Sequence, residues 1–205
     1  LKLELRTVHR TCMKSASKHT FWMKGHTEMV YNKNEADNHL FERNLLNYGK
    51  DAHTHLHHIV TNWYNLADYT IFLQGNPFEH DCETCVEFIN DCDFTMPFYP
   101  IGPTYIREND GCIKQAVDYC EKMEIEYKLP FMFIGGMQCI VKKEQIKKRS
   151  LDFYVKLMES IAKNISTSSF SGGAHGNDPQ IWALEYSWPT IFGVNEMLTH
   201  KLDNC

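Results

Sequence analysis

The sequence contains no apolar run near the roughly 20 residues that a helix needs to cross a bilayer, and no charged-then-apolar leader. Charged residues make up only 23% of the 205 residues, which argues against a disordered tail or a long solvated coiled coil. The net charge is −5, and the one basic run, 142–149, is interleaved with other residue types, as on the wet face of a helix. We therefore expect neither a membrane span nor a nucleic-acid partner.

Cysteines are present, but not in the pattern of a zinc ribbon. Cys82 and Cys85 form a C-x-x-C without a second pair at the required distance. Cys92 and Cys120 fall in helical patterns and Cys139 in a strand pattern. In a chain with this much core material, we interpret the eight cysteines as free thiols in a reducing compartment, with a metal or redox role for the C-x-x-C as the alternative.

Two other motifs are also incomplete. The histidine run 53–58 lacks the glutamate of H-E-x-x-H, which disfavours a zinc peptidase and favours histidines on the helix surface or in the core. Gly49-Lys50-Asp51 matches no complete P-loop or dinucleotide fingerprint. At the start of a helix, however, its backbone N–H groups and its cation could contact a diphosphate or sugar hydroxyls.

Strand and helix patterns alternate along the chain, and 43% of the residues are hydrophobic. We expect strands over 1–8, 28–32, 69–73, 94–99 and 131–141, and helices over 50–64, 82–92, 112–123, 144–164 and 179–188. The strand 131–141 is broken at Gly135-Gly136, and 144–164 is one helix or two with a joint near Ser150. The apolar run Tyr69–Leu73 indicates a strand buried on both faces. The fold class is therefore α/β, a mixed, mostly parallel central sheet flanked by helices in a single domain over 1–205.

Ligands of such sheets lie beyond the carboxyl ends of the strands, so the polar segment 74–81 after Tyr69–Leu73 is the first candidate site. It carries two amides, two carboxylates and an imidazole, which could hold a divalent cation on a diphosphate. The alternative is a polar turn in which Asp81 caps the next helix. Asp91-x-Asp93 resembles a metal-binding pair but precedes a strand, so it ranks lower.

The segments near the end of the chain offer further candidates. The loop 172–178 carries His175 and Asp178, and Glu185 follows two turns later on a helix. Either carboxylate could act as a base, a nucleophile or a partner of a sugar hydroxyl, although Asp178 could simply cap the helix. Trp182 and Trp188 could stack on a sugar ring or pack in the core.

Residues 47–60 read Asn-Tyr-Gly-Lys-Asp-Ala-His-Thr-His-Leu-His-His-Ile-Val, and 71–80 read Ile-Phe-Leu-Gln-Gly-Asn-Pro-Phe-Glu-His. These blocks resemble the N-x-G-R-E-x-H-T-Y-L-x-x-I and F-L-Q-G-x-P-F-D-H motifs of a little-characterised glycosyltransferase-like family. Residues 135–141 resemble its second conserved strand, and 182–192 its closing W-x-x-E-x-x-W. The match runs in order through most of 28–193. It implies a GT-A fold that uses a UDP-sugar and usually manganese, with Mg²⁺ as the other candidate metal.

The resemblance also implies a set of site residues. In GT-A enzymes an Asp-x-Asp follows the central strand, where this chain has Gln74-Gly75-Asn76. Lys50 and Asp51 replace the usual Arg and Glu, so the bidentate fork of arginine is lost. The expected metal ligands are Asn76, His80, Asp81 and His175. The expected donor-binding residues are Thr7, His9, Arg10, Lys50, Asp51, Gln74, Gly75, Asn76, Gly135 and Gly136, and the expected catalytic residues are Asp178 and Glu185.

The resulting hypothesis is a metal-assisted transferase that moves a glucose- or rhamnose-like sugar from a UDP-sugar to a glycan or glycoprotein, with retention slightly favoured. The resemblance extends to a viral glycosyltransferase associated with capsid-protein glycosylation, so it implies a capsid glycan as the first acceptor to consider and a cytoplasmic location. Two alternatives stay open. One is a non-catalytic sugar- or nucleotide-binding domain that keeps the fold, and the other is a zinc hydrolase built on the histidine run. Further domains beyond Cys205 are left open as well.

Overall fold

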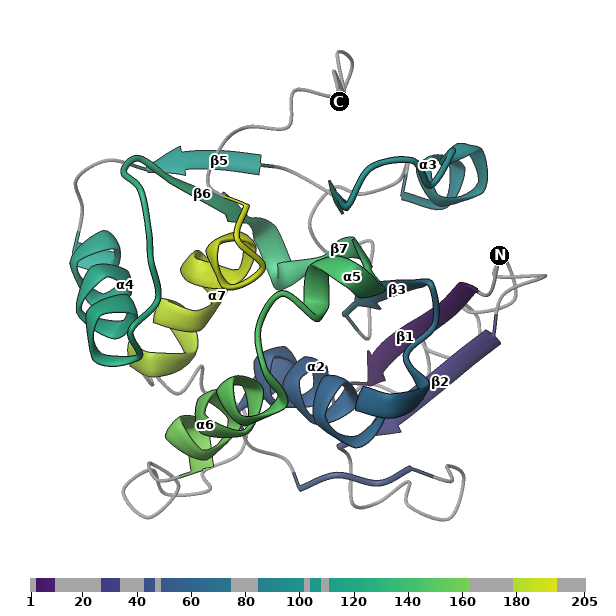
Figure 1. The fold of residues 1–205 in the computed structure, drawn as a ribbon, viewed down its shortest axis with the longest axis horizontal. Helices are drawn as coiled ribbons and strands as arrows, with labels where there is room; N and C mark the ends of the chain where they lie inside the picture. The colour runs from purple at the N-terminus through teal and green to yellow at the C-terminus, as the bar shows by residue number, and fades with distance from the viewer. Residues whose placement is uncertain are drawn as a thin grey trace.

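Three parallel strands begin the main sheet, in which β1 (Leu3–His9) lies between β2 (Thr27–Asn32) and β3 (Tyr69–Leu73). The computed structural model describes residues 3–9, 27–33, 43–46, 49–74, 85–101, 104–107, 111–162 and 179–194. Since the strands run parallel, their carboxyl ends meet at one edge, and the arrowheads of β1 and β2 in Figure 1 point the same way.

The other half of the sheet is antiparallel. β7 (Cys139–Lys142) pairs antiparallel with β3 and with β4 (Phe98–Pro100), which gives the order β2-β1-β3-β7-β4. A separate two-stranded sheet joins β5 (Thr104–Arg107) and β6 (Phe131–Ile134), also antiparallel. The mixed α/β class is confirmed, but the prediction of mostly parallel pairing is wrong. A strand buried on both faces has the same apolar run whichever way its neighbour points.

Helices cover the main sheet and link it to the small one. They are α2 (Lys50–Thr61), the short η2 (Trp63–Asn65), α3 (Cys85–Asp91), α4 (Gly111–Lys122), η3 (Gly135–Met137), α5 (Lys143–Ile146), α6 (Leu151–Ala162) and α7 (Pro179–Ile191). α2 packs against α6, and α7 packs against both α4 and β6 (Figure 1). None of the helices in the described ranges has the length and apolar character needed to cross a membrane.

Strand β3 divides the core in two. Phe72 belongs to the larger cluster, which it shares with α2, α4, α6, α7 and β6, while Tyr69, Ile71 and Leu73 belong to a smaller cluster on the opposite face. This alternation is the period of a strand. Every residue of β3 is buried, so the prediction of a strand covered on both faces is confirmed.

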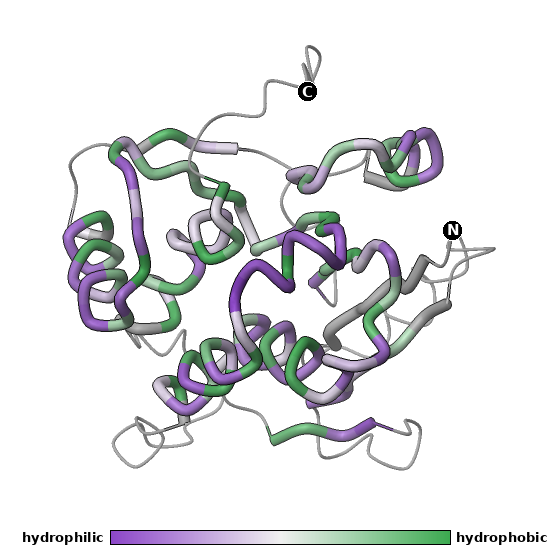
Figure 2. The backbone as a smooth tube through the Cα atoms, viewed as in Figure 1, coloured by the Kyte–Doolittle hydropathy of each residue, from purple (hydrophilic) through white to green (hydrophobic). Residues whose placement is uncertain are grey.

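Most predicted elements are present, with shifts at several ends. The predicted strand 94–99 is reduced to β4, the predicted helix 144–164 is divided into α5 and α6 on either side of Ser150, and α7 continues past Pro189. Residues 142–149 form a largely hydrophilic stretch between β7 and α6 in Figure 2, in which Glu144, Lys147 and Lys148 are exposed while Gln145 and Ile146 are buried. Cys92, Cys120 and Cys139 are free thiols, and the last two are buried.

Candidate functional site

The edge formed by the carboxyl ends of β1, β2 and β3 holds the first predicted site residues. Thr7 lies beside Leu73 of β3, and His9 lies beside Asn32 at the end of β2. Gln74 follows β3 directly at the same edge. Because α/β sheets bind their ligands beyond the carboxyl ends of their strands, this edge is where a ligand is expected.

Helix α2 begins at this edge in an unusual conformation. Gly49 has φ 64°, and a Cβ there would lie 2.7 Å from both His53 Cβ and Ile161 Cγ2. Lys50 also has a positive φ, 45°, which is uncommon for a residue with a side chain. Asp51 follows in the first turn and is buried. The tight fit at Gly49 therefore fixes where Lys50 and Asp51 lie, at the positive end of the helix dipole.

A buried lysine supports the start of α2. Lys33 is the first residue after β2, is 2% exposed, and donates a hydrogen bond from Nζ to the carbonyl oxygen of Lys50. The sequence analysis missed Lys33, because a lysine just after a strand usually lies in solvent. The only signal in the sequence was that Lys33 is a single basic residue among the polar residues directly after the strand.

Gln74 joins the start of α2 to the turn that follows β6. Its Nε2 donates to Asp51 Oδ2 over 3.3 Å, and its backbone N–H donates to Oε1 of the fully buried Gln138, also over 3.3 Å. Gly136 lies against the Gln74 amide so closely that a Cβ would be 2.5 Å from its Cδ and Nε2. Gly136 also has φ 67°, so glycine suits this position for two reasons. Gln138 is the second residue that sequence reasoning missed.

Helix α7 brings two more side chains to the site. Glu185 Oε1 accepts a hydrogen bond from the Gly136 N–H over 3.1 Å, and the ring of half-buried Trp182 lies 5.1 Å from Lys50 Nζ. Trp188 is fully buried and packs against His55, Phe72 and Phe192, so its interpretation as core is confirmed. Five predicted residues from four separate segments therefore lie in one connected group: Lys50, Asp51, Gln74, Gly136 and Glu185.

The histidines of α2 are core residues. His53, His55 and His58 are buried, and burial lowers the pKa of His53 and of His55 from 6.5 to about 3, helped in both by the charge of Lys33. His58 Nδ1 is within 3.0 Å of both the Tyr31 hydroxyl and Asn62 Nδ2. These histidines pack inside the protein, and His58 also forms hydrogen bonds there, so the simpler interpretation as core residues is confirmed for them.

The residues around Gln74 do not make up a metal centre by themselves. In the part of the chain that the structure describes, no group of three His, Cys, Asp or Glu could hold an ion. The connected group offers the Asp51 and Glu185 carboxylates and the Gln74 amide, fewer oxygen ligands than a divalent cation usually takes. The predicted site residues Arg10, Gly75, Asn76, His80, Asp81, His175 and Asp178 lie outside the described residues.

The lower-ranked candidate Asp91-x-Asp93 has a local structural role. Asp93 Oδ1 accepts hydrogen bonds from the backbone N–H of Thr95 over 3.1 Å and from the Tyr99 hydroxyl over 2.7 Å. Tyr99 also accepts a hydrogen bond from the N–H of Met96. Asp93 thus closes the turn that leads into β4, well along the chain from the connected group around Gln74.

No family model, curated protein or solved structure matches this chain. The functional argument is therefore built on the geometry of the connected group and on the sequence motifs that its residues belong to.

Proposed function

We propose that the chain is a glycosyltransferase that moves a sugar from a UDP-sugar to a glycan or glycoprotein, a capsid glycan being the first acceptor to test. One observation carries the proposal. The residues that the motif resemblance selected, in four separate segments, form one connected group at the carboxyl end of β3. A polar group at that place in an α/β sheet suits a nucleotide ligand.

The side chains of this group have the chemistry that a sugar diphosphate requires. Lys50 supplies a cation at a helix start whose dipole also favours negative charge, so both would attract the diphosphate. The Asp51 carboxylate and the Gln74 amide are suited to sugar hydroxyl groups, which both donate and accept hydrogen bonds. As the donor bond breaks, a fixed cation stabilises the charge that develops on the leaving diphosphate.

The fold proposed for this function is GT-A-like. Because β7 runs against both β3 and β4, the strands β1, β2, β3 and β4 all point in one direction, which supports a nucleotide-binding sheet with one reversed strand. A bound Mn²⁺ or Mg²⁺ would supply further positive charge to the diphosphate. The expected ligands Asn76, His80, Asp81 and His175 lie outside the described residues, and the titration below tests metal dependence.

Glu185 has two possible roles that a pair of variants separates. Since its Oε1 accepts a hydrogen bond from Gly136, Glu185→Gln keeps an acceptor there but removes the charge, whereas Glu185→Ala removes both. If Glu185 acts on the sugar as a base or nucleophile, both variants lose transfer activity. If it only holds the turn at Gly136, Glu185→Gln keeps most of the activity and Glu185→Ala loses it.

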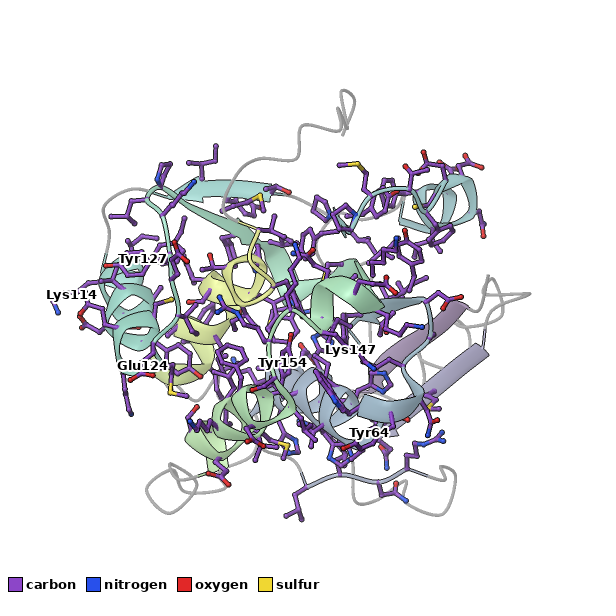
Figure 3. The ribbon with its side chains drawn as sticks, in the orientation of Figure 1. Tyr64, Lys114, Glu124, Tyr127, Lys147 and Tyr154 are labelled. Carbon is purple, nitrogen blue, oxygen red and sulfur yellow. The ribbon has the colours of Figure 1, made fainter. Side chains whose placement is uncertain are left out.

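The first experiment is a calorimetric titration of UDP, with GDP and CMP as controls, with and without manganese. Lys50→Met should weaken UDP binding about tenfold or more, the loss expected for a hydrogen bond to a charged group. The matched control is Lys114→Met on α4, whose exposed ammonium forms an ion pair with Asp118 one turn along the helix and which is labelled in Figure 3. Equal UDP affinity in both variants would refute the assigned role of Lys50.

The competing function is a domain that keeps the fold without catalysis. The hydrogen bond from the Gly136 N–H to Glu185 favours this alternative, because it gives the Glu185 carboxylate a structural role. UDP binding without transfer or donor hydrolysis would support this alternative. Failure of UDP, GDP and CMP to bind under every condition would reject the transferase.

A further inference from the structure

Lys33 is placed at the junction of two elements that meet at the candidate site. It follows the last residue of β2 and reaches the first residue of α2, where Nζ donates to the Lys50 carbonyl oxygen. The two residues are 17 positions apart, so this contact ties the sheet edge to the helix start. With 2% of its surface exposed, Lys33 is among the largest fully buried side chains of the described chain.

Burying an ammonium is costly unless it gains strong interactions in return. Lysine is rarely buried this completely, so its position at the start of α2 calls for a specific role. Its positive charge also acts on the neighbouring histidines, because it contributes to the lowered pKa of His53 and of His57. Those rings stay uncharged near neutral pH, so they add no positive charge beside the ammonium of Lys33.

The residue that Lys33 contacts is one of the four non-glycine residues with a positive φ in the described ranges. Lys50 has a positive φ of 45° directly after Gly49, which also has a positive φ. A residue with a side chain is held in that region only when its surroundings fix it. The hydrogen bond from Lys33 supplies such a restraint on the turn from which Lys50 and Asp51 project.

We infer that Lys33 is a positioning residue whose ammonium fixes the first turn of α2, so that Lys50 and Asp51 are oriented toward a bound diphosphate. The position of the first turn also affects the rest of the site, because Asp51 accepts a hydrogen bond from Gln74. The diphosphate in this inference rests on the proposed function, whereas the anchoring of α2 does not.

The anchoring is tested without any ligand, by amide hydrogen exchange of the full chain. In Lys33→Met the amide of His53, which donates to Gly49 in the first turn, should exchange at least tenfold faster than in the wild type. The amide of Asn62, which donates to His58 at the other end of α2, should keep its rate and serves as the internal control. Equal acceleration at both amides, or none at His53, would overturn the inference, since a general loss of stability affects both ends.

The orientation toward a diphosphate is tested by titrating UDP into the same variant. The dissociation constant should rise about tenfold or more in Lys33→Met, as when a hydrogen bond to a charged group is lost. In Lys33→Ala, added n-propylammonium should restore UDP affinity and n-propanol should not. If the cavity only needed to be filled, the two additives would restore UDP affinity equally. Wild-type affinity in Lys33→Met, or equal effects of the two additives, would overturn the role. If UDP does not bind the wild-type chain, the proposed function fails, while the exchange result still decides the anchoring.

Discussion

Gly136 lies where the Gln74 amide leaves no room for a side chain. We predict that Gly136→Ala lowers the free energy of unfolding by about 1–3 kcal/mol, because the new Cβ would overlap the amide and the residue would keep a positive φ. Urea denaturation measures the change. Gly111→Ala is the control, since a Cβ at that helical position meets nothing within 4 Å. A loss at position 136 no larger than at 111 would show that Gln74 moves aside freely.

His55 makes the stability of the protein depend on pH. Its pKa falls from 6.5 in the unfolded chain to about 3 in the folded protein, because the ring is buried between Phe72 and Trp188. Above pH 6.5 both states are neutral there. As the pH falls from 6.5 toward 3, only the unfolded chain gains the proton, so stability is lost, on the order of 2 kcal/mol at pH 5.

We therefore predict that His55→Phe reduces the loss of stability between pH 7.5 and pH 5. His53, whose pKa is also lowered to about 3, should leave part of the pH dependence in place. Urea denaturation at the two pH values gives the drop in the free energy of unfolding for the wild type and for the variant. A change in packing affects both pH values alike, so it does not enter the comparison of the two drops. An unchanged loss in the variant would mean that the buried His55 ring can take up a proton in the folded state.

Local patterns predicted the helices and central strands well, because each element shows its period within a few residues. Tyr69–Leu73 was predicted with its observed ends, and α2 begins at the predicted Lys50. The Gly135-Gly136 break separates β6 from β7 as expected. β5 was not predicted, since four residues that pair only with β6 carry too little pattern. The antiparallel pairing of β7 was not predicted either, because strand direction depends on partners that are distant in the sequence.

The candidate site could be predicted in part for the same reason. Lys50, Asp51, Gln74 and Glu185 each belong to a recognisable motif, and the rule for strand ends selected the segment that begins at Gln74. Their contacts join residues 23 positions apart, in the case of Gln74 and Asp51, and 49 apart, in the case of Gly136 and Glu185. Sequence spacing cannot reveal such contacts, and it gave no sign that Lys33 and Gln138 are buried supports.

The two sheets share one core across the described chain. Phe72 of the main sheet, Phe131 of the small sheet and Ile113 of α4 belong to the same cluster, and Trp188 of α7 packs among them. Trp188 is fully buried, with its ring 5.0 Å from that of Phe192 and 6.0 Å from that of Phe72. Because a shared core couples the sheets, neither can lose its packing alone, and both should unfold together.

We predict a single unfolding transition, with calorimetric and van't Hoff enthalpies that agree, and a loss of about 3–5 kcal/mol in Trp188→Ala. Tyr64→Ala is the control, because Tyr64, which is labelled in Figure 3, is 84% exposed and its loss should change stability by no more than about 0.5 kcal/mol. Scanning calorimetry and far-ultraviolet circular dichroism measure both quantities. Two separate transitions in the wild type would mean that the small sheet, with α4, unfolds independently. Gly136 lies on η3 and Glu185 lies on α7, and these elements join the two sheets. In that case, only the main sheet would still hold the connected group.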